Sequence, residues 1–128
     1  MPSVTDEELK KYLLAGKIAK RAREFGAASV KPGGSSLELS NAIERIIKDS
    51  GGLCAFPVNI GINDIAAHYT PSRQDDARFN LGDIVKIDVG AHVDGYPADT
   101  SVTVEVGTRN NTRLIECADD ALRCASRW

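Results

Sequence analysis

The sequence lacks both a surplus of charge of one sign and a long apolar run. Sixteen Lys and Arg residues stand against eighteen Asp and Glu residues, so the net charge is -2 at pH 7. Binding to nucleic-acid phosphates needs a surplus of basic side chains, so nucleic acid is not an expected partner. No stretch reaches the roughly 20 apolar residues that span a bilayer, and the first residues lack the apolar segment of a secretory signal. We therefore expect no membrane contact and a cytoplasmic location.

Cysteine is scarce as well. The three cysteines, Cys54, Cys117 and Cys124, are an odd number and show no C-x-x-C spacing. This pattern favours neither a disulfide framework nor a structural zinc site. We expect reduced, mostly buried thiols, with Cys117 and Cys124 on the buried side of a final helix. Glycine-rich phosphate loops and nucleophile elbows are also missing from the sequence.

The first half of the chain has the pattern of two helices. Thr5 and Glu8 form a capping box that predicts a helix over residues 5–30, and the Pro-Gly-Gly run after Lys31 ends it. A second capping box at residues 35–38 begins a shorter helix that Gly51 and Gly52 end. In the first helix we expect the apolar residues to share one buried face: Leu9, Leu13, Ile18, Ala22 and Phe25.

From Leu53 the apolar period changes from near 3.6 to near 2, which indicates strands. The clearest strands cover residues 84–89 and 101–106, joined by a tight hairpin turn at residues 93–95, with another turn at residues 80–83. Residues 111–128 are again helical in pattern, and the chain is expected to end inside that helix. The element order predicts one α+β unit with an antiparallel sheet.

The most informative residues are two aspartates, Asp88 and Asp99, eleven positions apart on either side of the expected turn. Asp88 lies in an apolar strand, where an unpaired carboxylate is costly to desolvate. A loop of two or four residues places the two aspartates opposite or diagonal to each other, with both side chains on one face of the sheet. Two carboxylates in such a position either share a proton or bind a hard or borderline cation. The alternative is that Asp88 ends a strand beside Gly90 and Asp99 caps a turn beside Thr100.

Of the two histidines, His68 is the candidate for chemistry. It ends a short apolar stretch and can exchange a proton near neutral pH or orient a substrate carbonyl. The alternative for His68 is a structural hydrogen bond in a strand or loop. His92 lies beside the hairpin turn and is expected to be a surface residue.

Three segments in fixed order resemble the amino-terminal half of type II methionine aminopeptidases of the archaeal kind. They are residues 56–59 (FPVN) with Asn63 and residues 66–71 (AHYTP after Ala66), then residues 86–90 (KIDVG), then residues 94–100 (DGYPADT). The resemblance runs from the first helix through the strand that ends near Val106. It implies a pita-bread fold, in which two similar halves enclose a metal site.

On this resemblance, residues 1–128 are a single incomplete pita-bread domain, the amino-terminal half, and the carboxy-terminal half needed to complete the site is missing. The implied activity is metal-dependent removal of the initiator methionine from nascent polypeptides. Asp88 and Asp99 are implied metal ligands for two divalent ions, of Co, Mn, Fe or Zn. His68 is implied to contact the substrate and assist catalysis, and Phe56 to line the methionine pocket. This chain alone is expected to be inactive.

Two other functions are compatible with the same fold. One is a non-catalytic pita-bread binding protein, which is disfavoured because Asp88, Asp99 and His68 are all present. The other is a proline-directed dipeptidase, which shares the two aspartates but usually has an extra amino-terminal domain. Only four residues precede the first helix cap in this sequence.

Overall fold

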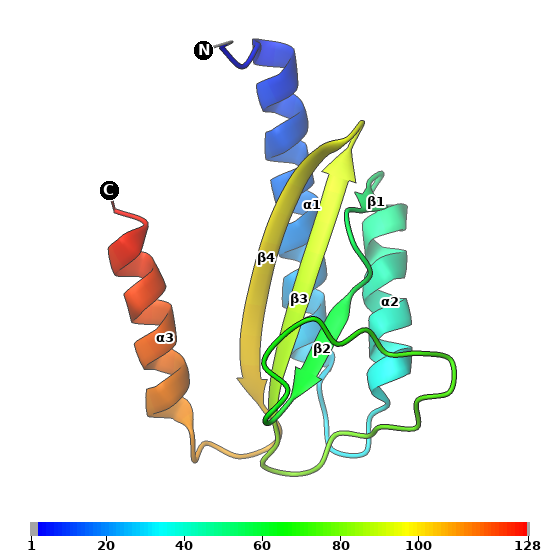
Figure 1. Cartoon of the computed structure of the whole chain (residues 1–128), viewed down its shortest axis with the longest axis vertical. Helices are drawn as coiled ribbons and strands as arrows, with labels where there is room; N and C mark the ends of the chain where they lie inside the picture. Colours follow the sequence, from blue (N-terminus) through cyan, green and yellow to red (C-terminus); the bar gives the residue numbers. More distant parts are fainter. Residues whose placement is uncertain (1–2, 128) are drawn as a thin grey trace.

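The structure is a computed structural model and describes residues 3–127. Within these residues, helices precede and follow an antiparallel sheet (Figure 1). The elements in chain order are α1 (Asp6–Ser29), α2 (Ser36–Asp49), β1 (Leu53–Cys54), β2 (Asn59–Ile62), β3 (Ile84–Val93), β4 (Tyr96–Glu105) and α3 (Thr112–Ala125). The predicted α+β class is confirmed. The two hairpin strands are longer than the sequence pattern predicted.

Side-chain caps begin the first two helices. The Thr5 hydroxyl accepts a hydrogen bond from the Glu8 N–H at 3.2 Å, and the Glu8 carboxylate accepts one from the Thr5 N–H at 2.8 Å. The predicted capping box is therefore confirmed for α1. Ser35 caps α2 by accepting from the Glu38 N–H at 3.3 Å, but among the described contacts Glu38 returns no such bond.

The buried face of α1 consists mainly of small residues, which differs from the prediction. Ile18 and Ala22 are buried as expected, whereas Leu9, Leu13 and Phe25 are exposed. The other residues on the buried face of this helix are Ala15, Ala19 and Gly26. A Cβ atom at Gly26 would lie 2.8 Å from Cδ1 of Ile43, so α1 approaches α2 more closely than a larger residue allows. Close helix packing, rather than hydrophobicity alone, selects this face.

Strand β3 is the centre of the sheet. Along one edge it pairs with β1 and then with β2, and along the other edge it pairs with β4 over its whole length. Every partner is antiparallel, as predicted. Residues 55–58 separate β1 from β2 and leave the ladder there, next to Gly90 of β3.

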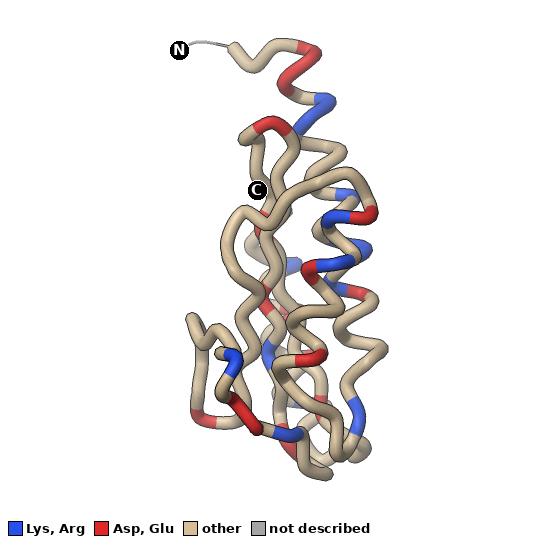
Figure 2. The backbone as a smooth tube through the Cα atoms, turned by 90° about the vertical axis from the view of Figure 1, so that its right-hand side faces the viewer, with Lys and Arg blue, Asp and Glu red and all other residues tan. Residues whose placement is uncertain are grey.

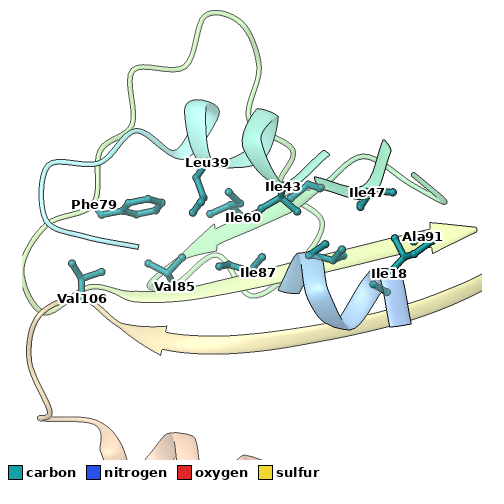
Figure 3. Close-up of a cluster of buried hydrophobic side chains, with 14 residues drawn as sticks. Ile18, Leu39, Ile43, Ile47, Ile60, Phe79, Val85, Ile87, Ala91 and Val106 are labelled. Carbon is teal, nitrogen blue, oxygen red and sulfur yellow. The ribbon is translucent and has the colours of Figure 1, made fainter. Parts of the chain in front are cut away.

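The hydrophobic core lies between the sheet and helices α1 and α2 (Figure 3). Alternate residues of β3 point into it: Val85, Ile87, Val89 and Ala91. The residues between them therefore face the opposite side of the sheet, because successive strand side chains alternate. That opposite side carries Lys86, Asp88, Gly90 and His92, and it is the polar side of the sheet.

Helix α3 lies to the side of β4 and away from the core (Figure 1). None of its residues is buried, and Leu114 and Leu122 are 64% and 67% exposed. Cys117 and Cys124 are exposed and Cys54 is half-buried, so the expectation of mostly buried thiols is wrong. The helix also ends at Ala125, with Ser126 as its C-cap, rather than running to the last residue, which lies outside the described part.

Charges of both signs are interspersed over the molecule (Figure 2). On α1, for example, the Lys11 ammonium forms an ion pair with Glu7 at 3.5 Å and a second one with Asp94 of the hairpin turn at 3.3 Å. In the described residues, no helix combines the length and the apolar character needed to cross a bilayer.

Helix α3 should be the least stable element of the chain. A helix of 14 residues without buried side chains depends on its own hydrogen bonds, which are marginal at this length. Amide hydrogen exchange followed by mass spectrometry should show rapid exchange in α3 and slow exchange in β3. Equal protection of the two segments would contradict this assignment.

Candidate metal and substrate site

A two-residue turn sets the geometry of the candidate site. Val93 pairs with Tyr96, so Asp94 and Gly95 alone form the turn, and both have positive φ, at 53° and 85°. A type I′ hairpin turn requires positive φ at both positions, which Asp-Gly sequences tolerate well. The register that follows pairs Asp88 with Ser101 and Gly90 with Asp99.

This register places Asp88 and Asp99 diagonally across the two strands, with both side chains on the polar side of the sheet. Neither residue ends a strand or caps a turn, because β3 continues to Val93 and β4 begins at Tyr96. The convergence on one face that the loop length predicted is therefore confirmed, and of the two arrangements left open the diagonal one is present.

Electrostatics indicate that the pair is poorly compensated. Burial raises the pKa of the Asp88 carboxyl, and the neighbouring Asp99 carboxylate raises it further. The imidazole of His68 acts in the opposite direction and lowers the pKa of Asp88. A carboxylate pair in this state is suited to a divalent cation, whose charge would offset the repulsion.

His68 reaches the aspartates from the long connection between β2 and β3. Two hydrogen bonds hold the residues after it against β2: the Ile60 N–H donates to the Tyr69 carbonyl at 2.8 Å, and the Thr70 hydroxyl donates to the Asn59 side chain at 2.6 Å. His68 itself has a positive φ of 61°, a conformation that is uncommon outside glycine. Such backbone strain persists only where surrounding contacts impose it, and it is frequent at functional sites.

A carboxylate further along the same connection holds its bend together. Asp75 accepts hydrogen bonds from the Tyr69 hydroxyl at 2.9 Å and from the Ser72 N–H at 2.5 Å. The bond to Asp75 also raises the pKa of the Tyr69 phenol. Asp75 therefore fixes the segment that follows His68, a supporting role that the sequence pattern did not reveal.

The site residues predicted from the sequence line one pocket of about 280 Å³. It is lined by Phe56, Asn59, His68, Asp88 and Asp99. Asn59 pairs with Asp88 in the β2–β3 ladder, so it belongs to the same side of the sheet. All four residues expected to act in binding or catalysis thus line one pocket. His92 lies nearer the turn, where its Nδ1 accepts from the Gly95 N–H at 3.1 Å.

The donor set fits a divalent metal only in part. Two carboxylates on one face are suitable oxygen ligands, and burial together with the Asp99 carboxylate raises the pKa of Asp88. Within residues 3–127, however, no group of three or more His, Cys, Asp and Glu side chains is placed to hold a metal ion. Asp88 and Asp99 therefore supply part of a coordination shell.

Comparison with known proteins agrees with this chemistry. The model of metallopeptidase family M24 matches residues 10–127, nearly the whole chain. The chain belongs to metallopeptidase family M24. Among curated M24 relatives, the methionine aminopeptidase of Pyrococcus abyssi is 49% identical over 118 residues, which are 92% of this chain and 40% of that protein. The chain thus spans about 40% of the length of such relatives.

Solved M24 structures share its fold. The methionine aminopeptidase of Thermotoga maritima superposes with a TM-score of 0.87 at 26% identity, over 98% of this chain and 54% of that one. The prolidase of Pyrococcus furiosus gives a TM-score of 0.74 at 29% identity, over 81% of this chain and 31% of that one. The predicted pita-bread fold is confirmed, and this chain forms part of it.

Removing one charge of the pair should stabilise the metal-free protein. A raised pKa means that the folded state holds the Asp88 proton more tightly, so ionisation of Asp88 costs stability as the pH rises through that pKa. We expect Asp88→Asn to increase the free energy of unfolding at pH 7 by roughly 0.2 to 1 kcal/mol. The measurement is urea denaturation in the presence of a chelator, which keeps the protein free of metal.

The exposed Asp64 provides the matched control for this experiment, since Asp64→Asn makes the same chemical change away from the pair. The gain of Asp88→Asn should shrink at acidic pH, where the wild-type carboxyl is protonated. A loss of stability at pH 7 for Asp88→Asn alone would contradict the proposed repulsion.

Proposed function

We propose that the protein containing this chain is a metal-dependent methionine aminopeptidase that removes the initiator methionine from nascent polypeptides. The observation that carries the proposal is the convergence of Asp88 and Asp99 beside His68 in one pocket. Membership of the M24 family, with methionine aminopeptidases among its curated relatives, supports this choice of reaction.

Each residue of the pocket has a role in this proposal. Asp88 and Asp99 hold divalent ions, which supply Lewis acidity for hydrolysis of an amide at neutral pH. His68 stands beside Asp88 and donates a hydrogen bond to the peptide bond that is cleaved. Phe56 offers an apolar surface to the methionine side chain.

The remaining ligands come, in this proposal, from sequence beyond the matched part of the longer relatives. Two carboxylates alone hold a divalent ion weakly, because such ions take about six ligands or require nitrogen donors as well. We therefore infer that residues 1–128 form the amino-terminal half of a domain and are inactive by themselves. The similarity to prolidase makes cleavage before proline the second candidate activity.

The natural gene product, meaning the full-length protein that contains this chain, should release methionine from a Met-Ala-Ser peptide only when divalent metal is added. Asp99→Asn should abolish this release, because removing one of the two carboxylates weakens the metal site. His68→Ala should lower kcat by about a hundredfold, the scale of a lost acid–base or hydrogen-bonding group, while metal stoichiometry is retained. Methionine is quantified by mass spectrometry, and bound metal by elemental analysis.

His92 is the control for His68, since it lies on the polar side of β3 near the turn but outside the pocket lining. His92→Ala should keep nearly full activity. Full activity of Asp99→Asn would refute the metal role, and cleavage of Met-Pro dipeptide in preference to Met-Ala-Ser would favour the second candidate.

A further inference from the structure

Gly90 lies on the polar side of β3, paired with Asp99, and has an aromatic ring directly against it. A Cβ atom placed on Gly90 would lie 2.6 Å from Cδ1 and 2.9 Å from Cζ of Phe56, and closer still to Cε1. Real Cβ atoms do not approach other atoms this closely. The ring therefore occupies the space that any side chain at position 90 would need. A glycine inside a strand often marks such an approach.

The backbone explains why the ring lies at this point. Gly90 is directly opposite Asp99 in the hairpin and two residues from Asp88. On the other edge of β3, the chain leaves the ladder between β1 and β2, and the Ala55 N–H donates to the Gly90 carbonyl at 2.9 Å. Phe56 is the next residue after Ala55, and its ring lies over β3 at Gly90, in the pocket that Asp88 and Asp99 also line.

We propose that Gly90 is a positioning residue that sets the substrate specificity of the pocket by letting the Phe56 ring lie against β3. This inference rests on the proposed aminopeptidase function. With the ring against the strand, the pocket keeps room for a long, flexible apolar side chain beside Asp88 and Asp99. A methyl group at position 90 lifts the ring off the strand and into that room.

The structure separates this role from a purely structural one. Gly61, on β2, likewise has no room for a Cβ atom. There the obstruction is the backbone carbonyl of Ile65, which can move only if the whole loop moves. At Gly90 the obstruction is the end of one half-buried side chain next to open pocket space. Gly90→Ala should therefore disturb the pocket while leaving the fold intact.

The test uses Gly90→Ala in the natural gene product loaded with divalent metal. We expect KM for Met-Ala-Ser to rise at least about tenfold, the scale of one misfitted methylene in an apolar pocket, while kcat and metal stoichiometry change little. The melting temperature should match that of the wild type. The matched control is Gly16→Ala, because a Cβ at Gly16 on α1 meets no atom within 4 Å. That control should leave KM unchanged.

A double-mutant cycle isolates the contact with the ring. Once Phe56→Ala has removed the ring, adding Gly90→Ala should change KM less than threefold. A tenfold change in that background would show that position 90 acts through something other than Phe56, and would overturn the proposal.

An activity-free measurement tests the contact itself. The Hα protons of Gly90 should show an upfield ring-current shift by NMR that Phe56→Leu removes. Absence of the shift overturns the proposal. A wild-type protein that releases no methionine overturns the proposed function and the specificity role together. If the wild type is active but the Gly90→Ala variant behaves like the Gly16→Ala control, only the role of Gly90 is overturned.

Discussion

The two-residue turn between β3 and β4 is the constraint on which the candidate site depends. With only Asp94 and Gly95 in the turn, the register pairs Gly90 with Asp99, so Asp88 and Asp99 face the same side of the sheet. One more residue in the turn, without a compensating bulge, would move every β4 side chain to the opposite face. The core reinforces this register, because Val85, Ile87 and Val89 occupy the helix-covered side and leave Asp88 on the polar one.

The site works against the stability of the chain that carries it. Burial and a second carboxylate both raise the pKa of Asp88, and His68 is held with a positive φ. Neither feature stabilises the fold. An asparagine at position 88 would avoid the charge repulsion, and a loop without the positive φ would avoid the strain. Unfavourable electrostatics and strain gathered at one pocket are typical of sites selected for chemistry. The family relationship to metallopeptidases is consistent with this interpretation.

The features that depend on residues close in sequence could be predicted from the sequence. The Thr5 cap depends on residues three positions apart, and the convergence of the aspartates depends only on turn length and strand alternation. Long-range packing decided the rest. Burial of small residues on α1 and exposure of α3 depend on which surfaces meet, and hydrophobic periodicity does not report this. The placement of His68 likewise depends on bonds to β2 from residues that the pattern showed only as a loop.

We propose that the β3–β4 hairpin presents Asp88 and Asp99 as joint ligands of a divalent metal. Anomalous diffraction from crystals of the natural gene product grown with Mn²⁺ tests it most directly. We expect an anomalous peak in contact with the carboxylates of both residues, next to Phe56 and His68. Metal bound at a distance from this pocket, or the two carboxylates on opposite sides of the sheet, would contradict it.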